Sequence, residues 1–222
     1  MIDADAIILG ASGLVGNALL NQLIHDDQIK KIRILVRRYM DVKNPKVEQE
    51  LENFEDMHSF KEAIGTGNTV YCCIGTTMKQ VKSDKTLYRK IDFDIPVNAA
   101  RFAIENGIRQ YVLVSAIGAN SSSGNFYIRL KGEVEKAISE IGFDSVHIMQ
   151  PSFLTGPRKE FRPLEIVFKP LIWGLSFLFV AGLKKYKPIA ASTVARAMIA
   201  AAKQNEKGVH RYTYEDMIRL NS

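Results

Sequence analysis

The 222-residue chain contains little cysteine and histidine, and both shortages exclude classes of protein. The only two cysteines, Cys72 and Cys73, are adjacent and could pair only through a strained ring, so no disulfide framework is expected. A reducing, cytoplasmic location is therefore predicted. The four histidines lie far apart and match no zinc spacing, so we expect no metal site.

The chain also lacks an obvious targeting signal or membrane span. Residues 1–5 do not show the basic and then apolar order of a signal peptide. One apolar run, residues 164–183, is interrupted by Lys169 and Pro170. Its uninterrupted part is 13 residues long, shorter than the roughly 20 residues that a spanning helix needs. We expect this run to be core or the face of a homodimer, with a substrate lid or a membrane-surface contact as the alternatives.

What is present is the composition of a single folded domain covering residues 1–222. Hydrophobic residues make up 46% of the chain and charged residues 24%, which excludes a disordered or fibrous protein. The net charge of +6 suggests acidic ligands. Nucleic acid is disfavoured because the basic clusters belong to no recognised nucleic-acid-binding module. A small-molecule substrate is the expected partner.

Apolar runs and helical patterns alternate along the chain. Strands are expected at 6–9, 32–36, 47–51, 69–74, 111–115, 145–149 and 209–212. Helices are expected from 14 onward, at 55–64, at 84–106 with a kink at Pro96, at 126–141 and at 193–203. This order predicts an α/β fold, a Rossmann-like doubly wound parallel sheet with helices on both faces. Residues 152–188 show no further strand–helix unit and are interpreted as a substrate-side insertion.

A glycine-rich turn joins the first expected strand to the first expected helix. Its residues are Gly10, Ala11, Ser12, Gly13, Leu14, Val15 and Gly16. Glycines at this junction permit a tight turn, close approach of a pyrophosphate and packing of helix on strand. The helix N-terminus offers free N–H groups to the phosphates. The turn therefore predicts a dinucleotide cofactor.

The end of the second expected strand distinguishes two nicotinamide cofactors. An NAD site usually has an acidic residue there, which binds the ribose 2′-hydroxyl. This chain has Arg37 and Arg38, and the nearest acid is Asp41. Guanidinium groups suit a 2′-phosphate, so NADP(H) is favoured over NAD(H). The alternative is that the arginines are solvated surface charges.

A tyrosine and a lysine four residues apart provide a candidate proton donor. Tyr127 and Lys131 fall on one face of the expected helix at 126–141. The ammonium stabilises the phenolate form, which readies the phenol for proton transfer to or from a carbonyl oxygen. Ser115 ends the preceding strand and could bind the same oxygen, although serines 121–123 follow in the next loop. Tyr39 and Lys43 have the same spacing but no accompanying signal.

Together these motifs resemble the atypical short-chain dehydrogenase/reductase superfamily, and within it the Tat-interacting-protein-like branch with its NAD(P)-binding domain. The resemblance extends over 10–16, 35–38, 71–77, 114–119, 127–133 and 150–154. It implies NADP(H) binding and catalysis by Ser115, Tyr127 and Lys131. It also implies further cofactor contacts from Cys73, Ile74, Gly75 and Thr76 on the adenosine and ribose side, and from Pro151, Ser152 and Phe153 beside the nicotinamide.

The chain departs from that pattern in two places. Where extended members often carry an asparagine on the central helix, this chain has Asp92 or Asn98, depending on the alignment. The C-terminal substrate region is also short. The leading hypothesis is an NADP(H)-dependent oxidoreductase that transfers hydride between the nicotinamide and a carbonyl or alcohol. The alternatives are a non-catalytic NADP(H)-binding regulatory or redox-sensing protein and a nucleotide-sugar epimerase-like enzyme, the latter disfavoured by the missing larger substrate domain.

Overall fold

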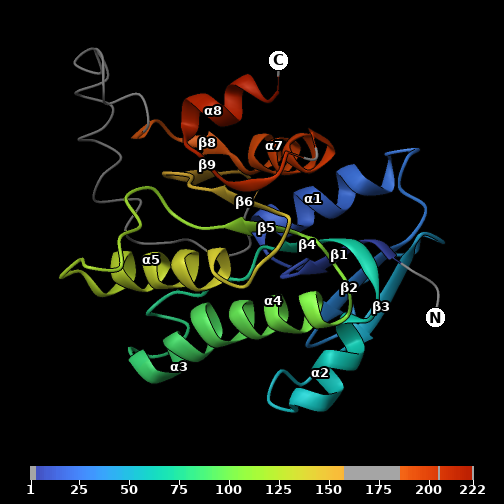
Figure 1. Ribbon diagram of the computed structural model, residues 1–222, viewed down its shortest axis with the longest axis horizontal. Coiled ribbons are helices and arrows are strands. Elements are labelled where there is room, and N and C mark those ends of the chain that lie inside the picture. The colour runs from blue at the N-terminus through green and yellow to red at the C-terminus, as the bar shows by residue number, and fades with distance from the viewer. Residues whose placement is uncertain (1–3, 158–185, 205, 222) are drawn as a thin grey trace.

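The computed structural model describes residues 4–157, 186–204 and 206–221 (Figure 1). The apolar run at 164–183 lies outside the described residues, as does most of the insertion expected at 152–188. The predictions for the apolar run, including a dimer face, a lid or a membrane-surface contact, therefore stay predictions.

A seven-stranded parallel sheet forms the centre of the protein, in the order β3-β2-β1-β4-β5-β6-β9. The strands are β1 (Ala4–Leu9), β2 (Ile32–Val36), β3 (Val47–Leu51), β4 (Gly67–Cys72), β5 (Gln110–Val114), β6 (Ser145–Met149) and β9 (Gly208–Tyr212). Strand β1 lies between β2 and β4, so the chain reverses its direction of winding there. Ligands bind at the carboxyl ends of the strands beside such a reversal. The doubly wound parallel sheet is confirmed.

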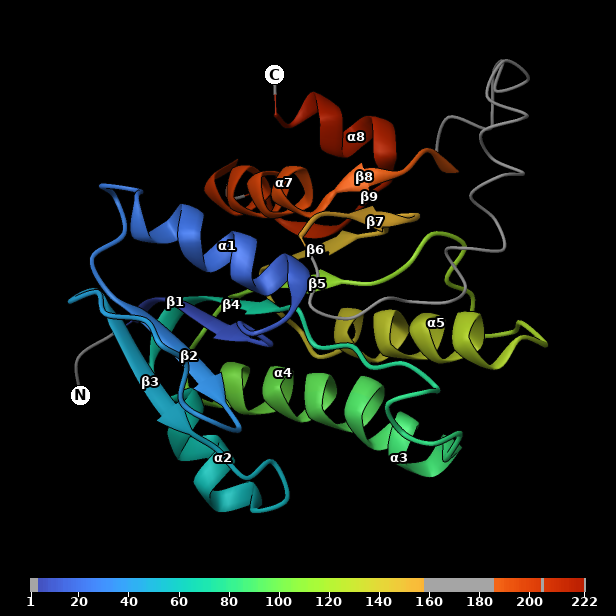
Figure 2. The ribbon, with the colours of Figure 1, turned by 180° about the vertical axis from the view of Figure 1, so that it is seen from behind.

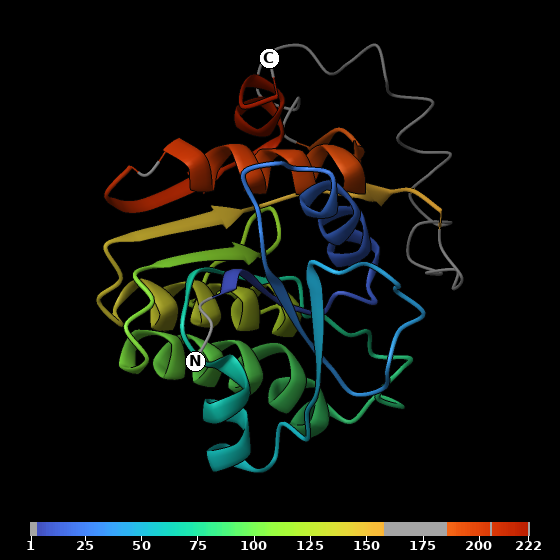
Figure 3. The ribbon, with the colours of Figure 1, turned by 90° about the vertical axis from the view of Figure 1, so that its right-hand side faces the viewer.

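Helices cover both faces of the sheet (Figure 3). On one face lie α1 (Leu14–Ile24), α7 (Ala191–Gln204) and α8 (Tyr214–Arg219), which Figure 2 shows above the sheet. On the other face lie α2 (Met57–Ile64), α4 (Ile95–Glu105) and α5 (Phe126–Ser139). The sheet is therefore the middle of three layers, which leaves its carboxyl edge to carry the site.

The position of β1 in the middle of the sheet explains why its sequence is a continuous apolar run. Ala6 and Ile8 pack into the core on the α1 side, whereas Ile7 and Leu9 pack into the core on the α4 side. All four are fully buried. Because successive side chains of a strand point to opposite faces, a strand covered by helices on both sides must be apolar throughout.

The helix expected at 84–106 is instead three joined segments. These are α3 (Lys85–Arg89), a π turn (Lys90–Asp94) and α4, which has Pro96 in its first turn. Proline lacks the N–H that would bond to the carbonyl of Asp92, so the regular α pattern fails just before it. The amide of Ile95 bonds instead to the carbonyl of Lys90, five residues back. The irregularity was predicted, but its form and position were not.

Three short elements were not predicted from the sequence. Helix α8 follows β9, and two short strands, β7 (Leu154–Thr155) and β8 (Ile189–Ala190), form a separate parallel pair. This pair brings the two ends of the expected insertion together. Strands of two residues carry too little pattern to be recognised in a sequence.

Candidate active site

The glycine-rich turn is held against β4 by backbone contacts that only glycine allows. Gly10 has a φ of +82°, and a side chain there would put its Cβ 2.8 Å from the carbonyl of Cys73. A Cβ on Gly16 would lie 2.2 Å from the carbonyl oxygen of Gly10. The amide of Cys73 also donates to the carbonyl of Leu9 at 2.8 Å. The turn, β4 and α1 thus meet backbone to backbone.

The N-terminus of α1 is well suited to bind an anion. The helix begins at Leu14 with Gly13 as its N-cap, and within the described chain no side chain caps it. Its first turn contains no acidic residue. The free amides and the helix dipole therefore favour a phosphate at this position. The residues present fit the pyrophosphate of a dinucleotide.

Two exposed arginines lie next to this turn. Arg37 and Arg38 follow β2, whose Leu35 pairs with Leu9 of β1, so both strands end at the same place. Both side chains are exposed, and in the part of the chain that the structure describes neither makes a hydrogen bond or an ion pair. They remain available to an anionic ligand.

Sequence reasoning missed Glu52, a buried carboxyl beside the same strand ends. Its amide donates to the carbonyl of Val36 at 2.8 Å, and one side-chain oxygen accepts a hydrogen bond from Ser59 at 3.1 Å. Among the described residues the other oxygen, Oε1, has no partner. Burial raises the pKa of the Glu52 carboxyl. No sequence motif marked this residue.

The segment after β4, residues 73–76, is fixed by the helix that begins at Lys85. The amide of Thr76 donates to Asp92 Oδ1 at 2.7 Å, and the Tyr88 hydroxyl donates to the carbonyl of Thr76 at 3.1 Å. Burial raises the pKa of the Cys73 thiol, which keeps it uncharged. The segment therefore presents backbone and a neutral surface beside the glycine turn.

Helix α5 presents the predicted tyrosine and lysine in different environments. Asn125 caps the helix by accepting the amide of Ile128. Tyr127, in the first turn, is 41% exposed, whereas Lys131 is buried with its Nζ 2.9 Å from Asp92 Oδ2. Burial would lower the pKa of Lys131, but the attraction of the Asp92 carboxylate outweighs it and raises that pKa. The ion pair with Asp92 therefore favours the charged form of Lys131, one helical turn from Tyr127.

Two ambiguities of the sequence are resolved by position. Asp92 lies against Lys131, whereas the Asn98 amide contacts the sulfur of Met57 on α2 at 3.5 Å. The Tyr39–Lys43 pair lies after β2, with Tyr39 70% exposed and Lys43 also exposed. A buried lysine with a carboxylate partner distinguishes the α5 pair from that surface pair.

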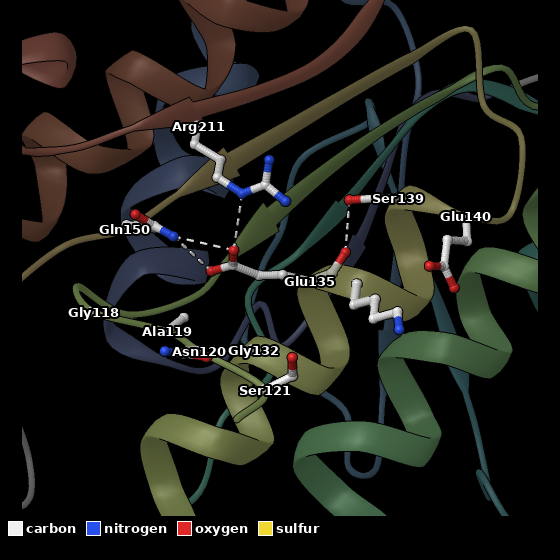
Figure 4. Close-up of a pocket in the computed structure, with 11 residues that line it drawn as sticks. Gly118, Ala119, Asn120, Ser121, Gly132, Glu135, Ser139, Glu140, Gln150 and Arg211 are labelled. Carbon is white, nitrogen blue, oxygen red and sulfur yellow. Dashed lines mark hydrogen bonds and ion pairs between the residues drawn. The ribbon is translucent and has the colours of Figure 1, made fainter. Parts of the chain in front are cut away.

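Ser115 lies buried just beyond β5, with its hydroxyl directed at a carboxylate. It donates to Glu135 Oε1 at 2.5 Å. The Glu135 carboxylate also accepts from Gln150 at 2.9 Å and from Arg211 at 3.2 Å (Figure 4). A hydroxyl has one hydrogen to donate. Ser115 can therefore polarise a carbonyl only after this bond to Glu135 breaks. The sequence could not show this competition, because Glu135 reads as an ordinary helix residue.

The pocket in Figure 4 is distinct from the predicted cofactor site. Residues from the loop after β5, from α5, from the end of β6 and from β9 line it: Gly118, Ala119, Asn120, Ser121, Gly132, Glu135, Lys136, Ser139, Glu140, Gln150 and Arg211. None of the predicted catalytic or cofactor-binding residues is in this set. Glu135 of this pocket accepts a hydrogen bond from the predicted catalytic residue Ser115.

The segment at 151–153 is tied down by hydrogen bonds on both sides. The carbonyl of Pro151 accepts from Ile117 at 3.0 Å, and that of Phe153 accepts from Ile189 at 2.9 Å. The Ser152 hydroxyl donates to the carbonyl of Lys187. The segment thus joins the loop after β5 to β8. Its expected place beside a nicotinamide stays a prediction.

The fold and the glycine-rich turn together define an NAD(P)-binding Rossmann domain. The chain belongs to the NAD(P)H-binding family, whose model matches residues 10–165. It is 35% identical to the mitochondrial protein FMP52 of Candida albicans over 207 residues, covering 90% of this chain and 89% of that protein. It is 29% identical to protein HTATIP2 of Rattus norvegicus, covering 90% and 81%. The resemblance to the Tat-interacting-protein-like branch is confirmed.

Solved structures of sugar-nucleotide enzymes share the fold. The UDP-N-acetylglucosamine 4-epimerase of Methanobrevibacter ruminantium superposes with a TM-score of 0.70 at 16% identity, covering 96% of this chain and 77% of the epimerase. DesIV of Streptomyces venezuelae, a dTDP-glucose 4,6-dehydratase solved with NAD, has a TM-score of 0.71 at 12% identity, covering 97% and 80%. At these identities the likeness establishes the architecture alone.

Cellular location is not established by these comparisons. No helix within the described residues has both the length and the apolar character needed to cross a bilayer. The FMP52 relative is labelled mitochondrial. The cytoplasmic location expected from cysteine usage therefore stays a prediction.

Proposed function

We propose that this protein is an NADP(H)-dependent oxidoreductase of the short-chain type that reduces a carbonyl compound. The observation that carries the proposal is the exposed Tyr127 phenol one helical turn from the buried, charged Lys131. A phenol beside a fixed cation is a proton donor whose phenolate product is stabilised where it forms. A merely cofactor-binding protein has no need of that arrangement.

The arginines after β2 support NADP(H) as the cofactor. A 2′-phosphate needs charged donors beside the ribose, and Arg37 and Arg38 are free to supply them. An acid also lies beside the end of β2, but this residue, Glu52, is buried and one of its oxygens accepts from Ser59. Arg37, the nearer of the two to the glycine turn in sequence, is assigned the main contact.

In this mechanism Tyr127 provides the proton for the substrate oxygen. A nicotinamide cofactor, when bound, would supply the hydride for the carbonyl carbon, and the carbonyl π electrons would then pass to the substrate oxygen. The Tyr127 hydroxyl transfers its proton to that oxygen to give the alcohol, and water restores the phenol. Lys131 would stabilise the transient phenolate and is assigned the nicotinamide ribose as a further ligand. Ser115 would assist only after its hydroxyl leaves Glu135.

The test is NADPH oxidation with a panel of aldehydes, ketones and quinones. Tyr127→Phe removes only the hydroxyl, and turnover should fall by at least 100-fold, the lower range for general acid catalysis. Tyr39→Phe, at the exposed tyrosine that also has a lysine four residues on, is the matched control and should keep full activity. Turnover unaffected by Tyr127→Phe would remove this residue from the mechanism.

The other functions considered are outcomes of the same experiment. Tight NADPH binding without reduction of any carbonyl would favour a regulatory or redox-sensing protein. Epimerisation of a nucleotide sugar without net NADPH consumption would favour a nucleotide-sugar epimerase-like enzyme, a function that only the similarity of the fold supports.

A further inference from the structure

A π turn in the helix facing α5 carries a buried carboxylate whose position the motifs do not explain. Asp92 is 1% exposed and lies in the middle of the turn Lys90–Asp94. Such turns insert one extra residue into a helix and are frequent at functional sites. The insertion precedes Pro96, where the regular pattern must break.

The two oxygens of Asp92 bind two different parts of the candidate site. Oδ1 accepts the amide of Thr76 at 2.7 Å, and Oδ2 lies 2.9 Å from Lys131 Nζ. A Cβ on Gly75 would lie 3.7 Å from Asp92 Oδ2 and 4.0 Å from Lys131 Nζ, so both charged groups lie against the loop that follows β4. Asp92 therefore links the loop after β4 to α5.

The pair is buried, so its charges depend on each other. The side chains are 8% exposed for Lys131 and 0% for Asp92. Burial alone would lower the pKa of Lys131, and the Asp92 carboxylate reverses that effect. A buried cation without its partner is costly and tends to lose its proton. The charge on Lys131 thus requires Asp92.

Besides Asp92, the titratable groups that act on this pair are two tyrosines and a cysteine. Tyr88 from α3 and Tyr127 from α5 both act on Lys131, and the buried Cys72 thiol of β4 faces the pair. On the outer side Arg89 and Glu133 form a more exposed ion pair of their own at 2.5 Å. Asp92 is accordingly the carboxylate that balances Lys131.

We propose that Asp92 is a positioning residue that holds the Lys131 ammonium in the site as a cation beside Tyr127, so that the phenolate formed when Tyr127 gives up its proton is stabilised. This inference rests on the proposed function. Without a charged Lys131, the phenolate that forms as the phenol gives up its proton has no cation to stabilise it, so proton transfer slows. A carboxylate 2.9 Å from the nitrogen favours the ammonium form and fixes its position.

The first test is the pH profile of NADPH-dependent carbonyl reduction. Asp92→Asn keeps an oxygen for the Thr76 amide but removes the charge. In Asp92→Asn the buried Lys131 loses its proton at lower pH, so the loss of reduction as pH rises should begin about one pH unit lower than in the wild type. Above that point turnover should fall about 10-fold relative to wild type. Asp94→Asn, an exposed residue of the same π turn, is the control and should keep the wild-type profile.

The second test needs no substrate. With lysine labelled with ¹³C at the ε carbon, the NMR signal of Lys131, assigned by its absence in Lys131→Met, reports its protonation. In wild type it should stay charged at a pH where the exposed lysines lose their protons. In Asp92→Asn it should lose its proton before them, because the Asp92 carboxylate no longer opposes the effect of burial on the pKa of Lys131.

The outcomes separate this inference from the proposed function. If the wild type reduces no carbonyl, the proposed function is refuted. If it does reduce one but the Asp92→Asn profile coincides with that of Asp94→Asn, the role of Asp92 is overturned while the function stands. If Asp92→Asn does not fold, the wild-type titration decides. A Lys131 that titrates together with the exposed lysines would then contradict the proposal.

Discussion

Replacing Gly16 with alanine is the sharpest perturbation of the predicted cofactor site. The added Cβ would lie 2.2 Å from the carbonyl oxygen of Gly10 and 2.8 Å from its carbonyl carbon. Both neighbours are backbone atoms, so no side-chain rotation can relieve the contact. The N-terminus of α1 must move away from the turn by roughly 1 Å, because Cβ atoms essentially never come within 3.0 Å of such atoms.

Two effects on stability oppose each other at this position. Alanine is favoured over glycine inside a helix by about 1 kcal/mol. Overpacking costs about 1–3 kcal/mol, and a clash between backbone atoms belongs at the upper end of that range. The net loss of about 1–2 kcal/mol corresponds to a Tm lowered by roughly 2–8 °C for a domain of this size.

The effect on cofactor binding should be larger than the effect on stability. Displacing the helix N-terminus weakens at least one charge-assisted hydrogen bond to phosphate, worth about 1.5–3 kcal/mol. The Kd for NADPH, measured by fluorescence titration, should rise roughly 10- to 100-fold. Gly124→Ala is the control, because a Cβ there meets nothing within 4 Å. Wild-type affinity and Tm in Gly16→Ala would refute the assignment of this turn.

Three further predictions follow from the described contacts. Arg37→Ala should raise the Kd for NADPH about 10-fold or more and leave the Kd for NADH unchanged. The control is Arg101→Ala, at an exposed arginine of α4, which should change neither Kd. Equal affinities of the wild type for the two cofactors would contradict the 2′-phosphate assignment. Ser115→Ala should cost about 1–3 kcal/mol in urea unfolding, because its buried carboxylate partner loses a donor, and a loss of turnover beyond 10-fold would show that the hydroxyl also serves the substrate. Burial, with a smaller effect from a neighbouring histidine, lowers the pKa of His147 to about 4, so the free energy of unfolding should fall as pH drops from about 6.5 to 4. His147→Asn should flatten that slope, and His58→Asn, at an exposed histidine, should retain it.

The sheet was predictable because each of its strands carries a local signal. Ile32–Val36 and Ser145–Met149 were located to the residue, since both are short apolar runs between polar segments. The π turn was not predictable, because its form depends on how the backbone accommodates Pro96 in a helix already packed on the sheet. Strands β7 and β8 depend on a contact between distant segments, which no local pattern records.

The candidate site was predicted in its parts but not in its connections. The glycine turn and the α5 residues are spaced by local geometry, which the sequence displays. That Asp92 and not Asn98 meets Lys131, and that Ser115 bonds to Glu135, follow from the packing of α5 against its neighbours. Buried acids such as Glu52 give no signal, because a glutamate in a sequence reads as a surface charge.

The central claim is that this chain transfers hydride from NADPH to a carbonyl while Tyr127 supplies the proton. The most direct measurement uses NADPH deuterated at the transferable position of the nicotinamide and analyses the product alcohol by mass spectrometry. The account predicts deuterium on the carbinol carbon with the wild type and the Tyr39→Phe control, and at least 100-fold slower labelling with Tyr127→Phe. Tight NADPH binding with no deuterium transferred to any carbonyl in the panel would contradict it.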